Sequence, residues 1–357
     1  MEKILIVGGY GKVGRIIARE LSKSQEDPVV VAGRDYGKAK TLSNELNNAV
    51  TPLLLNIDDF AEYKNRIKDV KLVIMCIDQE NTEFVEWCFD RGIHYVDITA
   101  SSEFLSKVEL LNQKAKLSES TAILSVGLSP GVTNLLAKLC KIRVPELRYL
   151  DIFVLLSAGE KHGSAAIRWM LENINSQFLV MENGRPKQVG SFREKKRTIF
   201  SDERNERTAY RFSFSDQWVI AKTLTIDSVS TWISLNYSFL MWAIYWMRKS
   251  GVSKLLNLGI IKWICLHLLT LFRFGSERFA VKVSAGVSEE EGYIYECALV
   301  GNGEAVITGL VTAEVARRIM HSSFSPGVFH IEELFDPLEF IESIGGYEVQ
   351  EKQLDQH

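Results

Sequence analysis

The 357-residue sequence lacks any metal-binding or disulfide pattern in its few cysteines and histidines. Its five cysteines are odd in number and widely spaced, and no two form a Cys-x-x-Cys pair. We therefore expect reduced, mostly buried thiols of a cytosolic protein and no metal site. The H-E-x-x-H and G-x-S-x-G patterns are also missing, so zinc-dependent and serine-hydrolase chemistry have little support.

An excess of charge of one sign is also lacking, because 42 Lys and Arg residues balance 45 Asp and Glu residues to a formal net charge of −3. Nothing in this balance favours a nucleic acid or an acidic membrane as an obligatory partner. We expect a small-molecule partner and no nucleic acid. The N-terminus shows neither the apolar h-region nor the small-residue cleavage site of a signal peptide, so a cytoplasmic location is expected.

The length exceeds what one hydrophobic core usually holds, so two domains are expected. Residues 1–131 alternate short β-branched runs with longer stretches of helical periodicity, a pattern typical of βαβ units. Strands are predicted at residues 4–7, 29–32, 53–56, 72–77, 95–97 and 122–125. The predicted fold class is α/β, with a Rossmann-type doubly wound parallel sheet and a second α+β domain.

The second domain is predicted over residues 132–304, where longer strand-like stretches indicate a mixed or antiparallel sheet. Residues 305–357 return to a helical pattern, with Thr312 as an N-cap, and are expected to complete the first domain. We expect the second domain to bind the substrate and to mediate a homodimer.

Residues 229–272 are strongly apolar and rich in tryptophan, yet they lack the uninterrupted run of about 20 apolar residues that crosses a membrane. Arg248 and Lys249 end the first apolar run, and Lys262 and His267 interrupt the second. We expect apolar helices here. Three interpretations are open: burial in the core or at a dimer interface, contact with a membrane surface, and the lining of an apolar channel.

The strongest local signal directly follows the first predicted strand, where Gly9, Gly11 and Gly14 have the spacing G-x-G-x-x-G and open a helix. The first glycine allows a tight turn, the second lets the backbone approach a pyrophosphate, and the third lets helix and strand pack closely. The phosphates then lie on free N–H groups of the helix start. The residues predicted to bind a dinucleotide are Gly8, Gly9, Tyr10, Gly11, Lys12, Val13 and Gly14.

The end of the second strand distinguishes the two nicotinamide dinucleotides. An acidic residue there bonds the ribose of NAD, whereas a basic residue pairs with the 2′-phosphate of NADP. Arg34 stands at this position and Lys38 follows one helical turn later, so we predict NADP(H) as the cofactor. Asp35 leaves NAD as an alternative. Asp58, after the third strand, is a second adenine-side candidate or a helix cap.

Four stretches resemble the saccharopine-dehydrogenase-like NADP-binding oxidoreductases in sequence, order and spacing. They are Gly8-Gly-Tyr-Gly-Lys-Val-Gly14, Val31-Ala-Gly-Arg-Asp35, Gly92-Ile-His-Tyr-Val-Asp-Ile-Thr99 and Gly127-Leu-Ser-Pro-Gly-Val-Thr-Asn134. The resemblance covers about residues 1–140, and residues 162–169 and 207–217 look like the substrate domain of bacterial members. It implies an NADPH-dependent reduction, often of a C=N bond formed between an amine and a carbonyl compound. Members acting on amino acids or polyamines tend to carry an acid where this chain has Ser129.

Ligands of open α/β sheets bind outside the carboxyl ends of the strands. The candidates at these ends are Cys76, Ile77, Asp78 and Thr99 for the cofactor, and Ser129, Pro130 and Gly131 for the substrate.

Because the cofactor carries the hydride, the protein must chiefly orient the acceptor and manage one proton. His162, in a loop after a second-domain strand, is the leading candidate for the proton donor, with a surface histidine as the alternative interpretation. Tyr210 and Arg211 are further catalytic candidates, since an arginine can hold a substrate carboxylate in a bidentate pair. Strand alternation sends these two side chains to opposite faces.

The leading functional hypothesis is an NADPH-dependent oxidoreductase that reduces the C=N bond of a small metabolite. One alternative is a reductase of a lipid or polyketide C=C bond, which the apolar region 229–272 would favour. Another is a non-catalytic dinucleotide-binding sensor, because fold alone does not establish a reaction.

Overall fold

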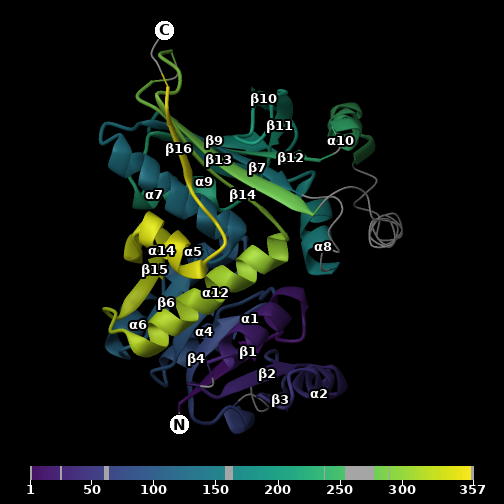
Figure 1. The fold of residues 1–357 in the computed structure, drawn as a ribbon, viewed down its shortest axis with the longest axis vertical. Helices are drawn as coiled ribbons and strands as arrows, with labels where there is room; N and C mark the ends of the chain where they lie inside the picture. Colours follow the sequence, from purple (N-terminus) through teal and green to yellow (C-terminus); the bar gives the residue numbers. More distant parts are fainter. Residues whose placement is uncertain are drawn as a thin grey trace. The chain divides into compact units, whose positions relative to one another are not determined.

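The computed structural model describes residues 2–24, 26–59, 64–156, 164–236, 238–253, 277–288 and 290–354. The chain divides into two compact units, each built from two segments (Figure 1). Unit 1 comprises Met1–Gly131 and Ala305–Leu334, and unit 2 comprises Val132–Glu304 and Phe335–His357. The chain therefore passes between the two units three times.

Unit 1 contains a seven-stranded sheet in the order β15-β6-β5-β4-β1-β2-β3, in which all neighbours run parallel. Its strands are β1 (Lys3–Val7), β2 (Val29–Gly33), β3 (Val50–Leu54), β4 (Val70–Met75), β5 (His94–Asp97), β6 (Thr121–Leu124) and β15 (Gly327–His330). Its helices are α1 (Lys12–Ser22), α2 (Tyr36–Glu45), α4 (Glu83–Phe89), α5 (Ser102–Glu109), α6 (Asn112–Leu117), α12 (Glu304–His321) and α13 (Ile331–Leu334). The predicted doubly wound α/β fold is confirmed.

The strands of this sheet are continuous apolar runs because helices cover both faces. Leu5 and Val7 of β1 pack in a core cluster with Trp87 and Phe89 of α4. On α12, a Cβ added at Gly309 would lie 2.5 Å from the Ile16 side chain, so α12 and α1 pack closely. The sheet is thus held rigidly between layers of helix, and its strand ends present fixed positions.

Unit 2 contains a seven-stranded mixed sheet in the order β10-β11-β12-β7-β13-β14-β16 and a separate β8-β9 hairpin. Its strands are β7 (Tyr149–Leu156), β8 (Gln177–Glu182), β9 (Arg185–Gly190), β10 (Lys195–Thr198), β11 (Arg207–Arg211), β12 (Ser228–Leu235), β13 (Arg278–Gly286), β14 (Tyr295–Asn302) and β16 (Gln350–Gln353). Its helices are α7 (Thr133–Arg143), α8 (Ser164–Asn173), α9 (Asp216–Thr223), α10 (Ser238–Ser250) and α14 (Pro337–Ile344). The segment η1 (Leu128–Val132), whose backbone is not helical at Ser129, Pro130 and Gly131, connects the first segment of unit 1 to unit 2 in the chain.

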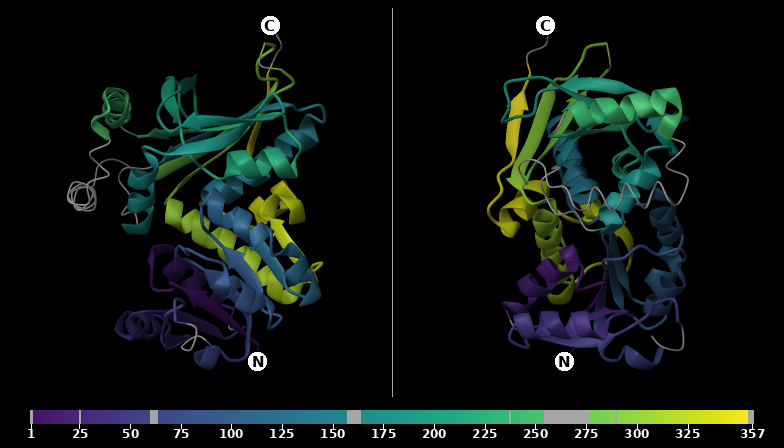
Figure 2. Two further views of the ribbon diagram at one scale, coloured as in Figure 1. Left: turned by 180° about the vertical axis from the view of Figure 1, so that it is seen from behind. Right: turned by 90° about the vertical axis from the view of Figure 1, so that its right-hand side faces the viewer.

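Helices α7 and α9 cover one face of the second sheet (Figure 2). The buried carboxylate of Asp216 fixes this layer, because it accepts hydrogen bonds from the hydroxyls of Thr133 on α7 at 2.9 Å and Thr231 on β12 at 2.6 Å. A buried carboxylate is stable only when such donors satisfy it. The Asp216 carboxylate therefore serves to hold this layer together.

The C-terminal segment differs from the expectation in two respects. Residues 335–357 belong to unit 2, because β16 pairs with β14 and α14 packs against α7. The helix α12 begins at Glu304, and Thr312 lies inside it with its hydroxyl bonded to the Thr308 carbonyl. The expected N-cap was wrong because the apolar run already starts at Ala305. The strand β15 interrupts the helical pattern at Gly327.

Residues 229–272 are only partly helical. Residues 228–235 form the strand β12, because Val229, Thr231 and Ile233 are β-branched residues at alternate positions of a buried sheet. The predicted helix is found at α10, and residues 254–276 lie outside the described part of the chain. Within the described residues, no helix combines the length and apolar character needed to cross a membrane.

Candidate functional site

The glycine segment forms a tight loop between β1 and α1. Gly8 has a φ of +76°, which favours glycine, and a Cβ on it would lie 2.5 Å from the Ile77 side chain. A Cβ on Gly14 would lie 2.5 Å from the Gly8 carbonyl oxygen and one on Gly9 2.9 Å from that of Ile6. The loop can therefore exist only with glycine at these positions.

This loop leaves the start of α1 open to an anion. Gly11 is the N-cap of α1 and has no side chain to occupy the first N–H groups. Lys12 and Val13, the first two helical residues, are half-buried. A helix start that carries no capping side chain and presents its positive dipole end is suited to a pyrophosphate.

Tyr10 connects the loop to the end of β2. Its hydroxyl accepts the backbone N–H of Asp35 at 3.1 Å, and its ring lies where a Cβ on Gly33 would be, within 2.5 Å. The Asp35 carboxylate caps α2 by accepting the Lys38 N–H at 3.0 Å, and this bond holds the pKa of Asp35 below its usual value. Asp35 is thus engaged as a cap.

Arg34 is exposed, and within the described residues no carboxylate lies within ion-pairing distance of it. Its neighbour Lys38 is paired with Asp35 at 3.5 Å but remains largely exposed. Two cations therefore flank the end of β2, where a 2′-phosphate would lie. Asp58 is exposed beyond β3, and its N–H bonds the Asn56 side chain at 3.3 Å.

The strand order reverses between β1 and β4, the position at which open α/β sheets bind ligands. Cys76, Ile77 and Asp78 follow β4 at this point. The Ile77 side chain lies against the glycine loop, 2.5 Å from where a Cβ on Gly8 would be. Burial raises the pKa of the Cys76 thiol, so it is not a reactive thiolate. These residues stay candidates for contact with the nicotinamide half.

The next strand end, where residues 97–99 are predicted to border the nicotinamide, holds a polar cluster whose members Tyr95 and Gln79 were not predicted. The buried carboxylate of Asp97 accepts the Tyr95 hydroxyl at 2.5 Å and the Thr99 N–H at 2.8 Å. The Gln79 amide lies 2.6 Å from the Tyr95 hydroxyl and 3.3 Å from Asp97. Burial raises the pKa of Asp97 to about 7. The motif Tyr-x-Asp at a strand end could have indicated this cluster.

The proposed substrate loop lies after β6. Ser129 is half-buried, Pro130 and Gly131 are buried, and Gly131 has a φ of +135°. Nearby, the Ser125 hydroxyl lies 2.8 Å from Nδ1 of His330, whose Nε2 lies 2.8 Å from Glu109. Ser125 and His330 are both buried, so this chain fastens β15 to β6 and is closed to a substrate.

The three catalytic candidates are distributed over unit 2. His162 lies outside the described residues. Tyr210 is buried in an aromatic cluster with Phe192 and Tyr245, and burial raises the pKa of its phenol. This environment favours packing over proton transfer near neutrality.

Arg211 faces the opposite side of β11. Its guanidinium pairs with Glu194 at 2.8 Å, donates to the Ser230 hydroxyl at 2.8 Å and lies 4.6 Å over the Trp232 ring. It lines a cavity of about 360 Å³ together with Lys195 and Lys196. A substrate carboxylate would have to replace Glu194 there.

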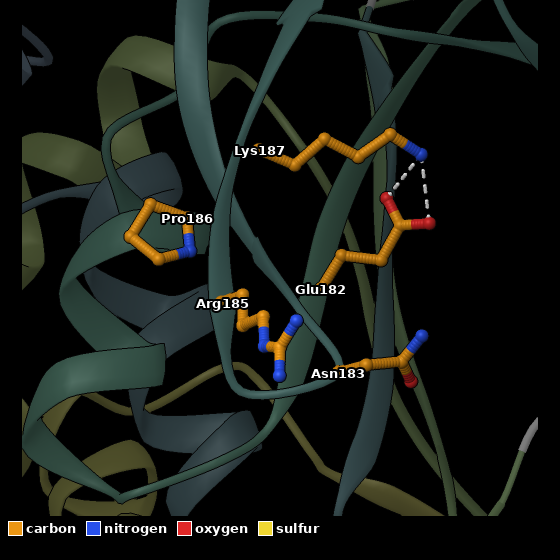
Figure 3. Close-up of a pocket in the computed structure, with 5 residues that line it drawn as sticks. All are labelled: Glu182, Asn183, Arg185, Pro186 and Lys187. Carbon is orange, nitrogen blue, oxygen red and sulfur yellow. Dashed lines mark hydrogen bonds and ion pairs between the residues drawn. The ribbon is translucent and has the colours of Figure 1, made fainter.

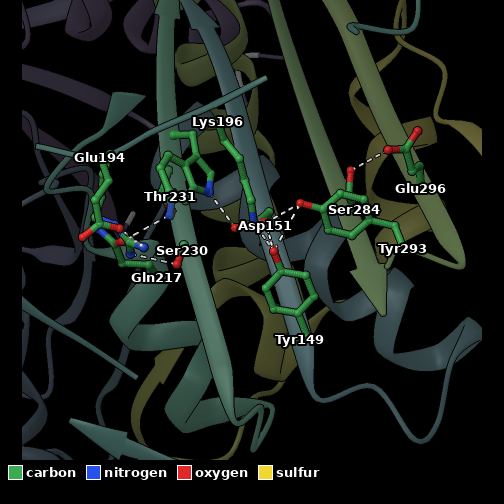
Figure 4. A network of polar contacts seen from close by, with 12 residues as sticks. Tyr149, Asp151, Glu194, Lys196, Gln217, Ser230, Thr231, Ser284, Tyr293 and Glu296 are labelled. Carbon is green, nitrogen blue, oxygen red and sulfur yellow. Dashed lines mark hydrogen bonds and ion pairs between the residues drawn. The ribbon is translucent and has the colours of Figure 1, made fainter. Parts of the chain in front are cut away.

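A buried carboxylate, Asp151, organises the same face (Figure 4). It accepts hydrogen bonds from the Trp232 indole at 2.5 Å and from the Tyr149 and Tyr293 hydroxyls, and it pairs with Lys196. Because every oxygen has a donor, this centre supports the sheet.

A second hollow of about 520 Å³ opens at the β8-β9 hairpin (Figure 3). It is lined by the Lys187–Glu182 ion pair, Asn183, Arg185 and Pro186, which offer no reactive group. Across the described residues, no three His, Cys, Asp or Glu side chains are placed to hold a metal ion.

Residues 4–123 match the sequence model of the family described as "Saccharopine dehydrogenase NADP binding domain". Curated proteins show no match to the chain. Among solved structures, the apo histidine-tagged saccharopine dehydrogenase (L-Glu forming) from Saccharomyces cerevisiae has a TM-score of 0.71 at 13% identity, covering 99% of this chain and 100% of that one. This likeness shows a shared fold.

Two further structures are more distant. A probable dehydrogenase from Thermotoga maritima has a TM-score of 0.45 at 10% identity, over 95% of this chain and 93% of that one. A myo-inositol dehydrogenase from Corynebacterium glutamicum has a TM-score of 0.44 at 13% identity, over 92% of this chain and 91% of that one. Scores below 0.5 support no conclusion.

The local geometry fits the cofactor that the family match assigns. The glycine loop packs too tightly for a Cβ at Gly8, Gly9 or Gly14, Gly11 brings no side chain to the start of α1, and the exposed Arg34 is available for a 2′-phosphate. NADP(H) is therefore the cofactor of this domain. The N-terminal domain therefore belongs to the family of saccharopine dehydrogenase NADP-binding domains, and the whole chain shares the fold of saccharopine dehydrogenase.

Proposed function

We propose that this oxidoreductase reduces the C=N bond that a small amine and a carbonyl compound form. The reaction adds a hydride to carbon and leaves the nitrogen with its proton, so that imine, NADPH and H⁺ give a secondary amine and NADP⁺. Bound NADPH supplies the hydride. The observation that carries the proposal is Asp97, a buried, protonatable carboxyl at the carboxyl end of β5, in register with Met75 at the end of β4.

The residues around the cofactor have distinct proposed roles. The glycine loop and the start of α1 bind the pyrophosphate, and Arg34 with Lys38 binds the 2′-phosphate. Asp58 lies on the adenine side. Cys76, Ile77, Asp78 and Thr99 border the nicotinamide half, and Ser129, Pro130 and Gly131 contact the substrate.

Asp97 gives the site a proton store near neutral pH. Its pKa of about 7 means that the carboxyl gains and loses a proton in the range where the reaction runs. The Tyr95 hydroxyl and the Gln79 amide extend this hydrogen-bonded chain away from Asp97. A group with this pKa suits an imine, whose nitrogen is most reactive when protonated.

Substrate recognition is proposed for Arg211. Its guanidinium is buried, stacked on Trp232 and paired with Glu194, which is 44% exposed and so free to turn outward. A substrate carboxylate that replaced Glu194 would accept the Nε and Nη2 donors of Arg211 that now reach Oε2 of Glu194. Glu194→Gln is therefore expected to lower the KM for a carboxylate-bearing substrate, and Arg211→Lys to raise it. An unchanged KM in both would remove Arg211 from the site.

A reductase of a lipid C=C bond is the second candidate function. The observation in its favour is the row of exposed aromatic side chains on α10, Phe239, Trp242 and Trp246. An exposed apolar surface of this kind marks an interaction site.

The test is NADPH oxidation, followed by its fluorescence, against panels of amines, carbonyl compounds, their mixtures and enoyl lipids. Turnover that requires both an amine and a carbonyl compound is the expected result. Asp97→Asn is expected to lower kcat at least about tenfold. The matched control is Asp69→Asn, which changes an exposed carboxylate before the start of β4, at the opposite edge of the sheet. Turnover of enoyl lipids without an amine would favour the second candidate, and binding of NADPH without turnover of either panel would indicate a sensor.

A further inference from the structure

Helix α10 has two unlike faces. Met241 and Ile244 are buried in an aromatic core cluster of unit 2, with Tyr245 partly buried beside them. The other face carries Phe239, Trp242, Trp246 and Lys249, which recur at helical spacing. Packing within unit 2 accounts for the first face but not for the second.

The second face is an aromatic ridge, defined by Phe239, Trp242 and Trp246. Their exposed fractions are 76%, 53% and 46%. The rings touch in sequence, since Phe239 stacks on Trp242 at 5.8 Å between centroids and Trp242 meets Trp246 edge-on at 6.2 Å. Three adjoining exposed aromatic rings form a contiguous patch, which soluble surfaces seldom present without a partner.

The surroundings of the ridge are basic. Residues 238–253 contain Arg248 and Lys249 and no acidic residue. The Lys249 ammonium lies 5.0 Å over the Trp246 ring, and Lys195 lies 5.6 Å over Tyr245. Burial and, to a smaller extent, the like charge of nearby Arg193 lower the pKa of Arg248, whose guanidinium donates to the Ser191 and Asn175 carbonyls.

We propose that the aromatic ridge of α10 docks on the surface of a bilayer that contains anionic lipid. Tryptophan and phenylalanine rings insert at the boundary between headgroups and acyl chains, while neighbouring lysine and arginine side chains reach the anionic headgroups. The helix would lie along the surface, with Met241 and Ile244 still in the core of unit 2. This contact is independent of the proposed reaction.

The size and charge of the ridge argue against a second copy of this chain as the occupant. Fully buried aromatic side chains contribute roughly 150–250 Å² each, so the exposed parts of three offer about 400 Å². A stable protein interface needs about 800 Å² on each partner. A second copy would also bring the same cations face to face, whereas an anionic membrane complements them.

Cosedimentation of the full chain with phosphatidylcholine vesicles, with and without phosphatidylglycerol, tests the proposal. We expect binding to the phosphatidylglycerol vesicles that salt weakens, accompanied by a blue shift of tryptophan fluorescence. The double variant Trp242→Ala/Trp246→Ala is expected to bind at least about tenfold more weakly. Lys249→Glu, which keeps the aromatic rings, should reduce binding to the anionic vesicles only.

The matched control is Leu110→Ala, which removes an apolar side chain that is 84% exposed in unit 1. It should bind vesicles like the unaltered chain. Vesicle binding that survives the double variant, or no binding by the unaltered chain, would overturn the proposal. So would a double variant that changes only the oligomeric state in sedimentation velocity, because the ridge would then be a protein interface. A failed reduction assay would leave this result unaffected.

Discussion

Replacement of Asp97 by asparagine should remove a fall in the free energy of unfolding that the unaltered chain shows as the pH rises. In the folded chain, burial raises the pKa of Asp97 to about 7 from 3.8. Between these two values the folded carboxyl keeps its proton, while the unfolded one has lost it. The folded state then binds more protons, so the free energy of unfolding falls as pH rises. Below pH 3.8 and above about pH 7, the contribution of Asp97 to the free energy of unfolding no longer changes with pH.

The size of this effect follows from the width of the window. A difference of roughly three pKa units, at about 1.4 kcal/mol per unit, makes the total loss about 4 kcal/mol between about pH 4 and pH 7. The asparagine side chain of the Asp97→Asn variant would resemble the protonated acid, because its Oδ1 accepts the Thr99 N–H and its amide donates to the Tyr95 oxygen. The variant should therefore match the unaltered chain near about pH 4 and exceed it in stability at about pH 8.

Urea unfolding of both chains from about pH 4 to pH 8 is the measurement. Subtracting the free energy of unfolding of one chain from that of the other cancels the contributions of the other titrating groups. This holds if the m value, the dependence of that free energy on urea concentration, is the same for both chains. The infrared C=O stretch of a protonated carboxyl, lost in the variant, gives an independent check of the pKa. Parallel pH profiles would refute the reasoning, because they would mean that Asp97 is already ionised in the folded chain.

Three further outcomes are expected. Arg34→Asp should reduce the preference for NADPH over NADH by at least about tenfold in a fluorescence titration; equal loss for both cofactors would point to misfolding of the loop instead. Gly14→Ala places a Cβ 2.5 Å from the Gly8 carbonyl oxygen, so calorimetry should detect no NADPH binding, and retained affinity would contradict the packing at α1. Cys140 and Cys297 are buried, with their sulfurs 3.5 Å apart, so both should react with a thiol reagent only on unfolding; rapid labelling of the native chain would show that α7 opens locally.

Local patterns predicted the parallel sheet and the NADP(H) cofactor of unit 1, while the roles of the single cofactor-binding residues stay predictions. The glycine spacing and Arg34 are read from a few consecutive residues whose conformation depends on their own backbone, and the parallel sheet follows from apolar runs between helices. The boundaries of β3 and β4 lay two or three residues earlier than predicted, because strand ends depend on their neighbours' register.

The remaining features depend on contacts between distant residues. Tyr95 and Asp97 become a cluster only when β4 brings Gln79 beside them. Trp232 looks like part of an apolar helix until it is paired with Arg211 in a sheet. The segment at β15 has a helical pattern around it, and only its pairing with β6 makes it a strand. The periodicity of a short sequence segment does not predict which distant residues it will contact.

The order in which the strands pair has a consequence for synthesis of the chain. The last strand of the first sheet, β15, joins β6 through Ser125 and His330, which are 205 residues apart. Six strands of that sheet are therefore synthesised long before the seventh, and the edge of β6 stays unpaired while unit 2 is synthesised. Contacts of such high sequence separation slow folding. A fragment that ends at residue 131 would keep this open edge permanently, so we expect it to aggregate where the full chain does not.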